Sequence, residues 1–417
     1  MKKTINILPL CFSLCCAIMI IAGCKKESSD VIPATNEILI GALLPMSTSD
    51  EGILGKASME FSVNDFNSLM DSAGSPLRLR LILADTKSDS ATAIQALDGL
   101  YAQGVRLLAG GPGSSMELMA MMDQINNKGM LMLNAYSTAP SLAIPSDNIF
   151  RLVPDDTKQS KAISKLLEFD GIEVVIAVWR NDNYGLGLFN AFKTDFELSG
   201  GLILNSISYP ANTTDFSDIA ASLNNQIIQA KIQFGADNVG VCYFGIDEST
   251  AMFSAALTQS DLGSINWYGC DGNAVLNDMA SDPQVAGFAK LVNFTALNMG
   301  IGTADFTPKN TAALSSRIQL STGLQPNVNT LSAYDAVRIL GYCYLATGNQ
   351  DIGHLKSVLP LICTSYNYLG ISRELNLAGD LLNANYIFWR IDSSGASYEW
   401  STYATYFAEG DYIEMKN

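Results

Sequence analysis

The sequence predicts an α/β protein made of two doubly wound parallel-sheet lobes, joined by a hinge of three chain crossings. Three observations support this fold class: short apolar runs alternate with amphipathic stretches, the alternation restarts after Pro154, and no short-period repeat is visible. Repeated βα units form parallel sheets that helices cover on both faces. Such sheets bind ligands at the carboxyl ends of their strands, so we expect a ligand site between the lobes.

The composition excludes several functional classes. The 417 residues include 25 Lys+Arg, 41 Asp+Glu and one His, and the formal charge is −16. This charge excludes binding to a nucleic-acid backbone. Hydrophobic residues make up 48% of the chain, which excludes disorder as its main state. The single histidine, His354, is expected in a polar loop, and no G-x-S-x-G elbow occurs. We therefore expect no enzyme activity, no cofactor and no metal site.

The first 23 residues have the pattern of a secretory signal, because two lysines precede an apolar run that ends in small residues before Cys24. Residues 21–24 (IAGC) resemble the lipobox of bacterial lipoproteins, which implies cleavage before Cys24 and a lipid on its thiol. The alternative is an uncleaved anchor helix, since about 18 apolar residues can span a bilayer. Both interpretations place the rest of the chain outside the cytoplasm, as a membrane-anchored protein.

The predicted elements follow a polar tether at residues 24–36. In the first lobe we expect strands at 38–44, 77–85, 105–110 and 130–134, alternating with helices at 55–69, 92–102 and 115–126. In the second lobe we expect helices at 160–169, 184–197, 216–229 and 249–262, alternating with strands at 174–179, 202–209, 239–244 and 265–269. An extended run at 290–297, a long helix at 331–346 and an aromatic strand pair ending at 386–391 complete the chain.

The expected lobes are discontinuous in sequence. Lobe 1 comprises residues 37–152 and 297–368, and lobe 2 comprises residues 153–296 and 369–417. The crossings are expected near 151–155, 290–297 and 366–372. Four cysteines remain after the lipidated one, and their even number permits disulfides outside the cytoplasm without proving any: Cys242, Cys270, Cys343 and Cys363. We expect each to be a buried small side chain.

Two hydroxyl-rich loops follow neighbouring strands of the first lobe. Residues 110–115 (GGPGSS) open a helix, and the bare amides of a helix N-terminus suit an anion. Ser114 and Glu117 also form a capping box, and a hydroxyl can serve both roles. Tyr136, Ser137 and Thr138 follow the next strand, where such residues are more often a turn than a site. In a parallel sheet the two loops lie side by side.

Two further residues are expected to face the cleft from the second lobe. Tyr184 lies on a tight turn into a helix, and Asp271 follows an apolar strand. Asp271 either caps the next turn or pairs with a cation. No Lys or Arg occurs in the matched loops, so a ligand ammonium would fill that role.

The order and spacing of these motifs resemble the branched-chain amino-acid-binding family of periplasmic substrate-binding proteins, the type I solute receptors of ABC importers. The resemblance covers nearly all of the mature chain and includes the first strand at 40–45 and the late Gly-Asp turn at 370–380. It implies a Venus-flytrap receptor of leucine-binding type that holds an α-carboxylate and an α-ammonium. The carboxylate would contact the serine loop (Gly113, Ser114) and the threonine loop (Tyr136, Ser137, Thr138). Asp271 would hold the ammonium, and Tyr184 would close over the ligand.

Two positions depart from the family pattern. Glu51 stands where amino-acid binders often carry an aromatic residue, and Ile246 stands where a second tyrosine is common. Glu51 is either a second acid that favours a polar or cationic ligand side chain, or a solvated residue in the first turn of a helix. The ligand's side chain therefore does not follow from the resemblance.

Two functions remain open from the sequence. The first is a binding lipoprotein that captures an amino acid or similar small zwitterion by hinge closure and delivers it to an ABC permease. The second is a sensory receptor of the same fold that signals to a membrane partner. Copurification of a permease or of a kinase would distinguish them.

Overall fold

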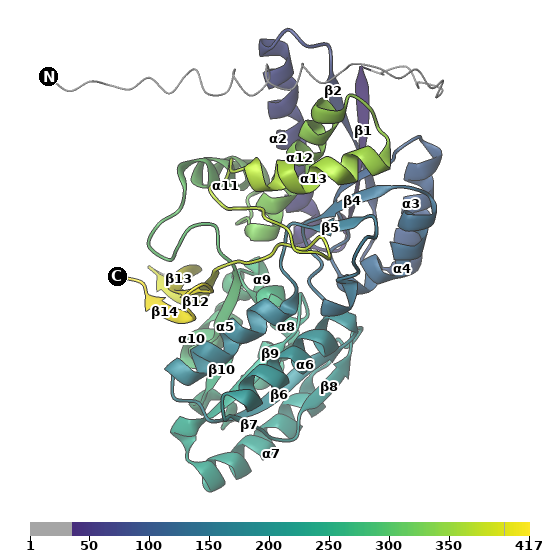
Figure 1. The fold of residues 1–417 in the computed structure, drawn as a ribbon. Helices are drawn as coiled ribbons and strands as arrows, with labels where there is room; N and C mark the ends of the chain where they lie inside the picture. Colours follow the sequence, from purple (N-terminus) through teal and green to yellow (C-terminus); the bar gives the residue numbers. More distant parts are fainter. Residues whose placement is uncertain (1–35, 396) are drawn as a thin grey trace, which may run out of the picture. The chain divides into compact units, whose positions relative to one another are not determined.

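The computed structural model describes residues 36–395 and 397–417, and within these ranges it contains two β-sheets (Figure 1). The lipobox, Cys24 and the tether lie outside the described residues. No helix of the described part has the length and the apolar character that crossing a membrane requires.

The first sheet is entirely parallel and has the strand order β2-β1-β3-β4-β5. Its strands are β1 (Glu37–Leu44), β2 (Arg78–Asp85), β3 (Leu107–Gly110), β4 (Leu131–Asn134) and β5 (Ile149–Arg151). The apolar side chains of β1 point alternately to two separate cores, and each core lies under its own helices. One face is covered by α2 (Asp50–Ser72), α12 (Val328–Thr347) and α13 (Ile352–Ser365), and the other by α3 (Ser90–Ala102) and α4 (Ser115–Asn127). α11 (Lys309–Thr322) packs beside α2.

The second sheet is mixed. Its parallel part contains β6 (Val174–Asn181), β7 (Leu202–Ile203), β8 (Ile207–Pro210), β9 (Val239–Phe244), β10 (Asn266–Tyr268) and β11 (Thr295–Met299). Three antiparallel strands extend the sheet beyond β11: β12 (Tyr386–Ser394), β13 (Ser397–Phe407) and β14 (Tyr412–Met415). One face packs on α5 (Asp156–Phe169) and α6 (Asn183–Leu198). The other packs on α7 (Ser217–Phe234), α8 (Ser249–Ala256) and α10 (Pro283–Leu291), with the short α9 (Asn277–Ser281) beside them.

Four expectations about local structure are wrong. The run 202–209 is two strands, because Asn205 and Ser206 interrupt it. Residues 290–297 are not one extended run: α10 begins at Pro283 after the Asp282 cap and continues to Leu291. His354 is not in a loop, because Asp351 caps α13 and accepts a hydrogen bond from the His354 amide at 2.9 Å. Residues 249–262 are not one helix, because α8 ends at Ala256. The C-terminal strands β12 and β13 form an antiparallel hairpin at Gly395, where φ is +64°.

Buried arginines hold the segments that run between the two sheets. Arg151, at the end of β5, donates to Asp380 at 2.5 Å, and neither side chain is exposed. Arg373 donates to Asp335 on α12 at 2.7 Å and to the carbonyl of Leu152 at 3.0 Å. Both pairs therefore join chain segments that are more than 35 residues apart. The lobe boundaries expected from the sequence remain a prediction.

We expect Asp335→Ala to lower the free energy of unfolding by about 3–5 kcal/mol, because it leaves Arg373 charged and buried without its partner. Replacing both residues, in Asp335→Leu with Arg373→Met, should cost less than the single change. The control is Arg80→Ala, which removes an exposed pair with Glu37 and should cost less than about 1 kcal/mol. Urea unfolding measures all three variants, and an equal cost for the buried and exposed pairs would contradict this account.

Candidate functional site

Loops from the carboxyl ends of strands in both sheets surround two adjoining cavities. The inner cavity has a volume of about 50 Å³ and the outer cavity about 280 Å³. Both are lined by Glu51, Asp247, Leu276 and Asn327, so the two cavities meet at these residues. The inner cavity is also lined by Gly113, Ser114, Ser115, Tyr136, Thr138, Tyr184, Ile246, Asp271, Gly272, Ala274 and Asn329. The structure thus brings together every candidate ligand residue named from the sequence except Ser137.

The N-terminus of α4 forms one wall of the inner cavity. Gly111 has a φ of +105°, and a Cβ there would lie 2.2 Å from Asn134, so the turn after β3 requires glycine. This turn places Ser114 as the N-cap: its hydroxyl accepts from the Glu117 amide at 3.2 Å and donates to the Glu117 carboxylate at 2.9 Å. The first turn of α4 therefore faces the cavity with amides that the helix itself leaves unpaired.

The loop after β4 is organised by Asn134. Its side-chain oxygen accepts from the amides of Tyr136 at 2.9 Å and Ser137 at 2.8 Å. The Ser137 hydroxyl donates to the carbonyl oxygen of Ser114 at 3.2 Å, so Ser137 ties the two loops together outside the cavity lining. Tyr136 and Thr138 line the inner cavity instead.

Two carboxylates, Asp156 and Asp271, share one glutamine. Asp156 lies beside the loop after β4, because its amide donates to the carbonyl oxygen of Thr138 at 3.0 Å, whereas Asp271 lines the inner cavity. Gln159 donates through its amide nitrogen to Asp156 at 2.5 Å and to Asp271 at 2.9 Å, and its oxygen accepts from the Asp271 amide at 3.2 Å. Tyr184 donates to Asp271 at 2.6 Å and accepts from the Gly272 amide at 3.1 Å. Asp271 is therefore held in place by two side chains that reach it from α5 and α6.

Asp156 is a candidate that the sequence analysis missed. The pair Asp155-Asp156 opens α5, and Asp155 alone caps the helix by accepting from the Thr157 amide at 2.9 Å. Asp156 is fully buried, and its Oδ2 atom has no hydrogen-bond partner among the described residues. The sequence did carry a signal for Asp156: a helix cap needs only one acid, and Asp155 is followed by a second.

Asp156 and Asp271 are both less stable in their charged forms than a carboxylate in water. Burial, followed by the neighbouring Asp271 carboxylate, raises the pKa of Asp156 well above its usual range. Burial likewise raises the pKa of Asp271, although the hydrogen bonds from Tyr184 and Gln159 oppose this. The positive charge of Arg151 lowers the pKa of Asp156, but Arg151 is already paired with Asp380 and donates to the carbonyls of Ser137 and Ala139 at 3.0 Å. The pair therefore lacks a protein cation of its own.

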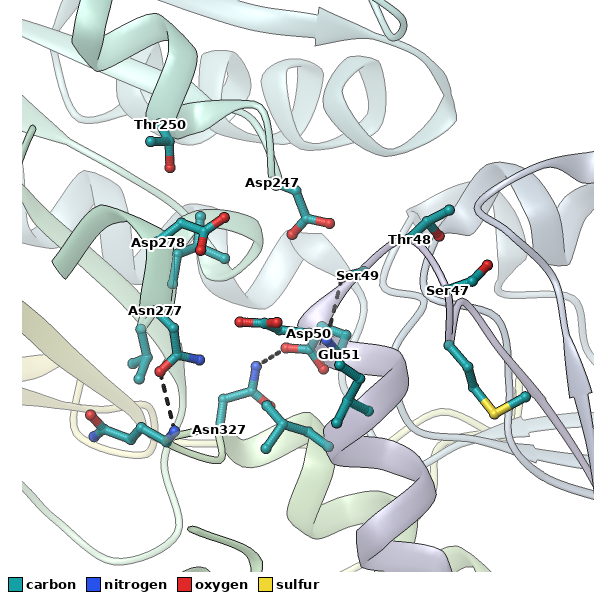
Figure 2. Close-up of a pocket in the computed structure, with 16 residues that line it drawn as sticks. Ser47, Thr48, Ser49, Asp50, Glu51, Asp247, Thr250, Asn277, Asp278 and Asn327 are labelled. Carbon is teal, nitrogen blue, oxygen red and sulfur yellow. Dashed lines mark hydrogen bonds between the residues drawn. The ribbon is translucent and has the colours of Figure 1, made fainter. Parts of the chain in front are cut away.

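Glu51 lies at the junction of the two cavities, in the first turn of α2 (Figure 2). Its Oε1 atom accepts from Asn327, whose own oxygen accepts from the Thr330 amide at 3.0 Å and so fixes the orientation of the amide group. Its Oε2 atom is buried without a hydrogen-bond partner among the described residues. The interpretation of Glu51 as a solvated residue is therefore wrong. Burial, then Asp247, raises the pKa of Glu51 to about 8.

Ile246 contributes an apolar wall to the inner cavity together with Ala274 and Leu276. The four cysteines that are candidates for disulfides are all buried and free. In the described part of the chain, no group of three or more His, Cys, Asp or Glu side chains is arranged to hold a metal ion. The acids around the cavities are thus not placed as a metal centre.

Residues 54–384 match the protein family described as the receptor family ligand binding region. The chain belongs to this family. The matched range includes Ser114, Thr138, Asp156, Tyr184 and Asp271, so both walls of the inner cavity lie in the family's ligand-binding region.

Solved structures confirm the predicted fold class, the type I periplasmic binding protein fold. The leucine-binding protein LivK from Thermotoga maritima aligns with a TM-score of 0.70 at 16% identity, covering 87% of this chain and 97% of that one. The branched-chain amino acid transporter substrate-binding protein LivJ from Streptococcus pneumoniae, solved with isoleucine, aligns with a TM-score of 0.68 at 17% identity, covering 88% and 99%. An ABC transporter solute-binding protein from Rhodopseudomonas palustris, solved with benzoate, aligns with a TM-score of 0.68 at 15% identity, covering 88% and 96%. At these identities the likeness shows the fold alone.

Two curated proteins match parts of the chain. The uncharacterized protein MJ1266 of Methanocaldococcus jannaschii is 28% identical over 266 residues, which are 61% of this chain and 62% of that protein. Glutamate receptor 2.7 of Arabidopsis thaliana is 24% identical over 217 residues, which are 51% of this chain and 22% of that protein. The chain thus covers less than two thirds of the length of either relative.

Glu51→Gln should stabilise the protein at alkaline pH. Burial raises the pKa of Glu51 to about 8 in the folded protein, whereas the ordinary pKa of this side chain is 4.5. Between these values the folded state binds more protons than the unfolded state, so the wild type loses stability as the pH rises through this window. We expect the difference in unfolding free energy, variant minus wild type, to grow by at least about 1 kcal/mol from pH 5 to pH 8. Urea unfolding at both pH values measures it.

The control is Glu60→Gln, which changes an exposed glutamate of the same helix. Its unfolding free energy relative to the wild type should be the same at pH 5 and pH 8. A variant-minus-wild-type difference for Glu51→Gln that is equal at both pH values would show that Glu51 is charged in the folded protein at neutral pH.

Proposed function

We propose that this protein captures an amino acid or a similar small zwitterion outside the cytoplasm and delivers it to an ABC importer. One observation carries the proposal: the inner cavity has helix N-terminal amides on one side and, on the other, the Asp271 carboxylate, which shares Gln159 with the buried Asp156 and has no protein cation of its own. These two sides have opposite electrostatic character. A ligand that carries one negative and one positive group satisfies both.

The carboxylate of the ligand is assigned to the α4 side. The amides of Ser114 and Ser115 lie in the first turn of the helix, where the helix dipole favours an anion. The Thr138 hydroxyl supplies a further donor from the neighbouring loop. These neutral donors suit one carboxylate better than a multiply charged phosphate, because neither cavity is lined by Lys or Arg within the described residues.

The ammonium of the ligand is assigned to Asp271 and Asp156. An ammonium group has three donors, and the two carboxylates with the Tyr184 oxygen offer acceptors from three elements. Binding it would remove the penalty that burial imposes on these acids. The acid pair argues against a ligand whose only charged group is a carboxylate, such as the benzoate that one structural neighbour holds.

Hinge closure is part of the proposal. The inner cavity is lined by loops of both sheets, so a ligand that contacts both walls favours the conformation in which the walls are close. The buried pairs of Arg151 and Arg373 lie on the segments between the sheets and would hold these crossings together as the lobes move.

The site of action and the partner also remain proposals. Lipidation at Cys24 would tether the protein to a membrane, next to a permease. Sensory signalling by the same fold is the alternative, and relatives named as receptors are consistent with it. A permease that copurifies supports delivery, and a kinase supports signalling.

Asp271→Ala should weaken the binding of the best amino-acid ligand by at least roughly thirtyfold, because removing one member of a buried charge pair costs about 2–5 kcal/mol. Asp156→Ala should act in the same direction. Isothermal titration calorimetry, after a thermal-shift screen over the amino acids, provides the measurement. Asp218→Asn, which changes an exposed acid of α7, is the control and should bind like the wild type. Unchanged affinity in a folded Asp271→Ala protein would rule out the amino-acid assignment.

A further inference from the structure

We propose that the ligand carries a second cationic group on its side chain, and that the outer cavity binds this group; the inference rests on the proposed function above. The ligand would then be a basic amino acid, with an ammonium or guanidinium group at the end of its side chain. The inner cavity is too small to contain such a side chain, whereas the outer cavity is more than five times larger and begins where the inner one ends.

Four carboxylates face the outer cavity from separate parts of the chain. Figure 2 shows Asp50 and Glu51 on α2, Asp247 in the loop after β9, and Asp278 on α9, gathered around one space. Glu51 and Asp247 lie at the junction with the inner cavity, and Asp50 and Asp278 line the outer cavity alone. A ligand side chain that leaves the inner cavity therefore meets Glu51 and Asp247 first.

An independent observation supports a ligand at the junction. Tyr136 is only 6% exposed, lines the inner cavity, and its hydroxyl has no hydrogen-bond partner among the described residues. The Oε2 atom of Glu51 is likewise buried without a partner in that part of the chain. Buried polar atoms are nearly always hydrogen-bonded in native proteins. These two groups from different loops are thus a ready acceptor pair for donors that the ligand brings.

The carboxylates at the junction lack a cation that could neutralise them. Arg180 is the cation that faces Asp247, and it is engaged by Asp182 at 2.5 Å and by Glu248 at 3.0 Å. Burial is the main cause that raises the pKa of Asp247 and of Asp50, and neighbouring carboxylates add to it. A cation that enters would therefore reduce the repulsion between these carboxylates.

The other groups of the outer cavity suit an organic cation. Asn277, Gln325 and Asn327 add amide oxygens, and Gln325 and Asn277 are joined by a hydrogen bond of 3.1 Å that fixes the side-chain oxygen of Asn277. The Thr250 hydroxyl is also buried without a partner among the described residues. Since the acids of this region are not arranged for a metal ion, an ammonium or guanidinium with several separated donors fits them better.

Matched pairs of ligands test the inference. Calorimetry on the wild type at neutral pH would compare arginine with citrulline, and lysine with norleucine; the members of each pair have similar shape and differ in the side-chain charge. We expect the cationic member of at least one pair to bind ten times more tightly or better. Glu51→Gln and Asp247→Asn should each reduce that ratio at least fivefold, because each removes one charge at the junction. Asp218→Asn, an exposed acid on α7, should leave it unchanged.

The outcomes separate this inference from the proposed function. If leucine and norleucine bind more tightly than lysine, and citrulline more tightly than arginine, the side-chain assignment is overturned and the zwitterion site survives. Ratios that do not change in Glu51→Gln and Asp247→Asn overturn the assignment to the outer cavity. If 1,5-diaminopentane, which lacks a carboxylate, binds more tightly than lysine, the zwitterion site fails while the second cation site stands. If no amino acid binds at millimolar concentration, both fail.

Discussion

Among the described residues, the cleft of this protein holds more carboxyl groups than the chain has free cations to neutralise, and the account of its function depends on this imbalance. Asp156 and Asp271 share one glutamine, and Glu51 shares a boundary with Asp247. The arginines that the nearest acids sense, Arg151 and Arg180, are already engaged by other carboxylates. A carboxylate in a water-poor site either keeps its proton or waits for a cation. Folding has already buried these carboxyl groups without a cation. A ligand that supplies the cation therefore removes this unfavourable free energy and binds more tightly.

The fold explains how such a site is stable. Most of the inner cavity is formed by segments that follow parallel strands, with Asn327 and Asn329 added from the start of α12, so Glu51, Asp247 and Asp271 stand near the ends of rigid elements. The buried acids Asp380 and Asp335 differ from the cleft acids, because each forms an ion pair with an arginine of the chain. The chain thus uses paired charges to fix its framework and unpaired charges to form its cleft.

Sequence patterns predicted most of the fold and about half of the candidate site. The βα alternation was sufficient to predict the strands, because the sequences of buried parallel strands are continuous apolar runs, as in β6 and β9. The antiparallel C-terminal strands were missed in part, because a hairpin turn carries little local signal. The sequence identified four site residues because they follow predicted strands: Ser114, Thr138, Tyr184 and Asp271. It did not identify Asp156, which follows a helix-capping aspartate, or Asp247, which lies in a short loop. The hydrogen bond from Asn327 to Glu51 could not be predicted from the sequence, because the two residues are 276 positions apart and meet only in the folded protein.

The most direct test of the charge imbalance is the number of protons exchanged when the ligand binds. Calorimetric titration of the tightest-binding amino acid at pH 7, repeated in two buffers with different ionisation enthalpies, gives this number. Because burial raises the pKa of Glu51, Asp156 and Asp271, the empty protein holds protons that an incoming ammonium would displace. The account predicts a net release of at least about half a proton per ligand. No net release, or proton uptake, would show that the cleft acids are already ionised or remain protonated, and would contradict the central claim.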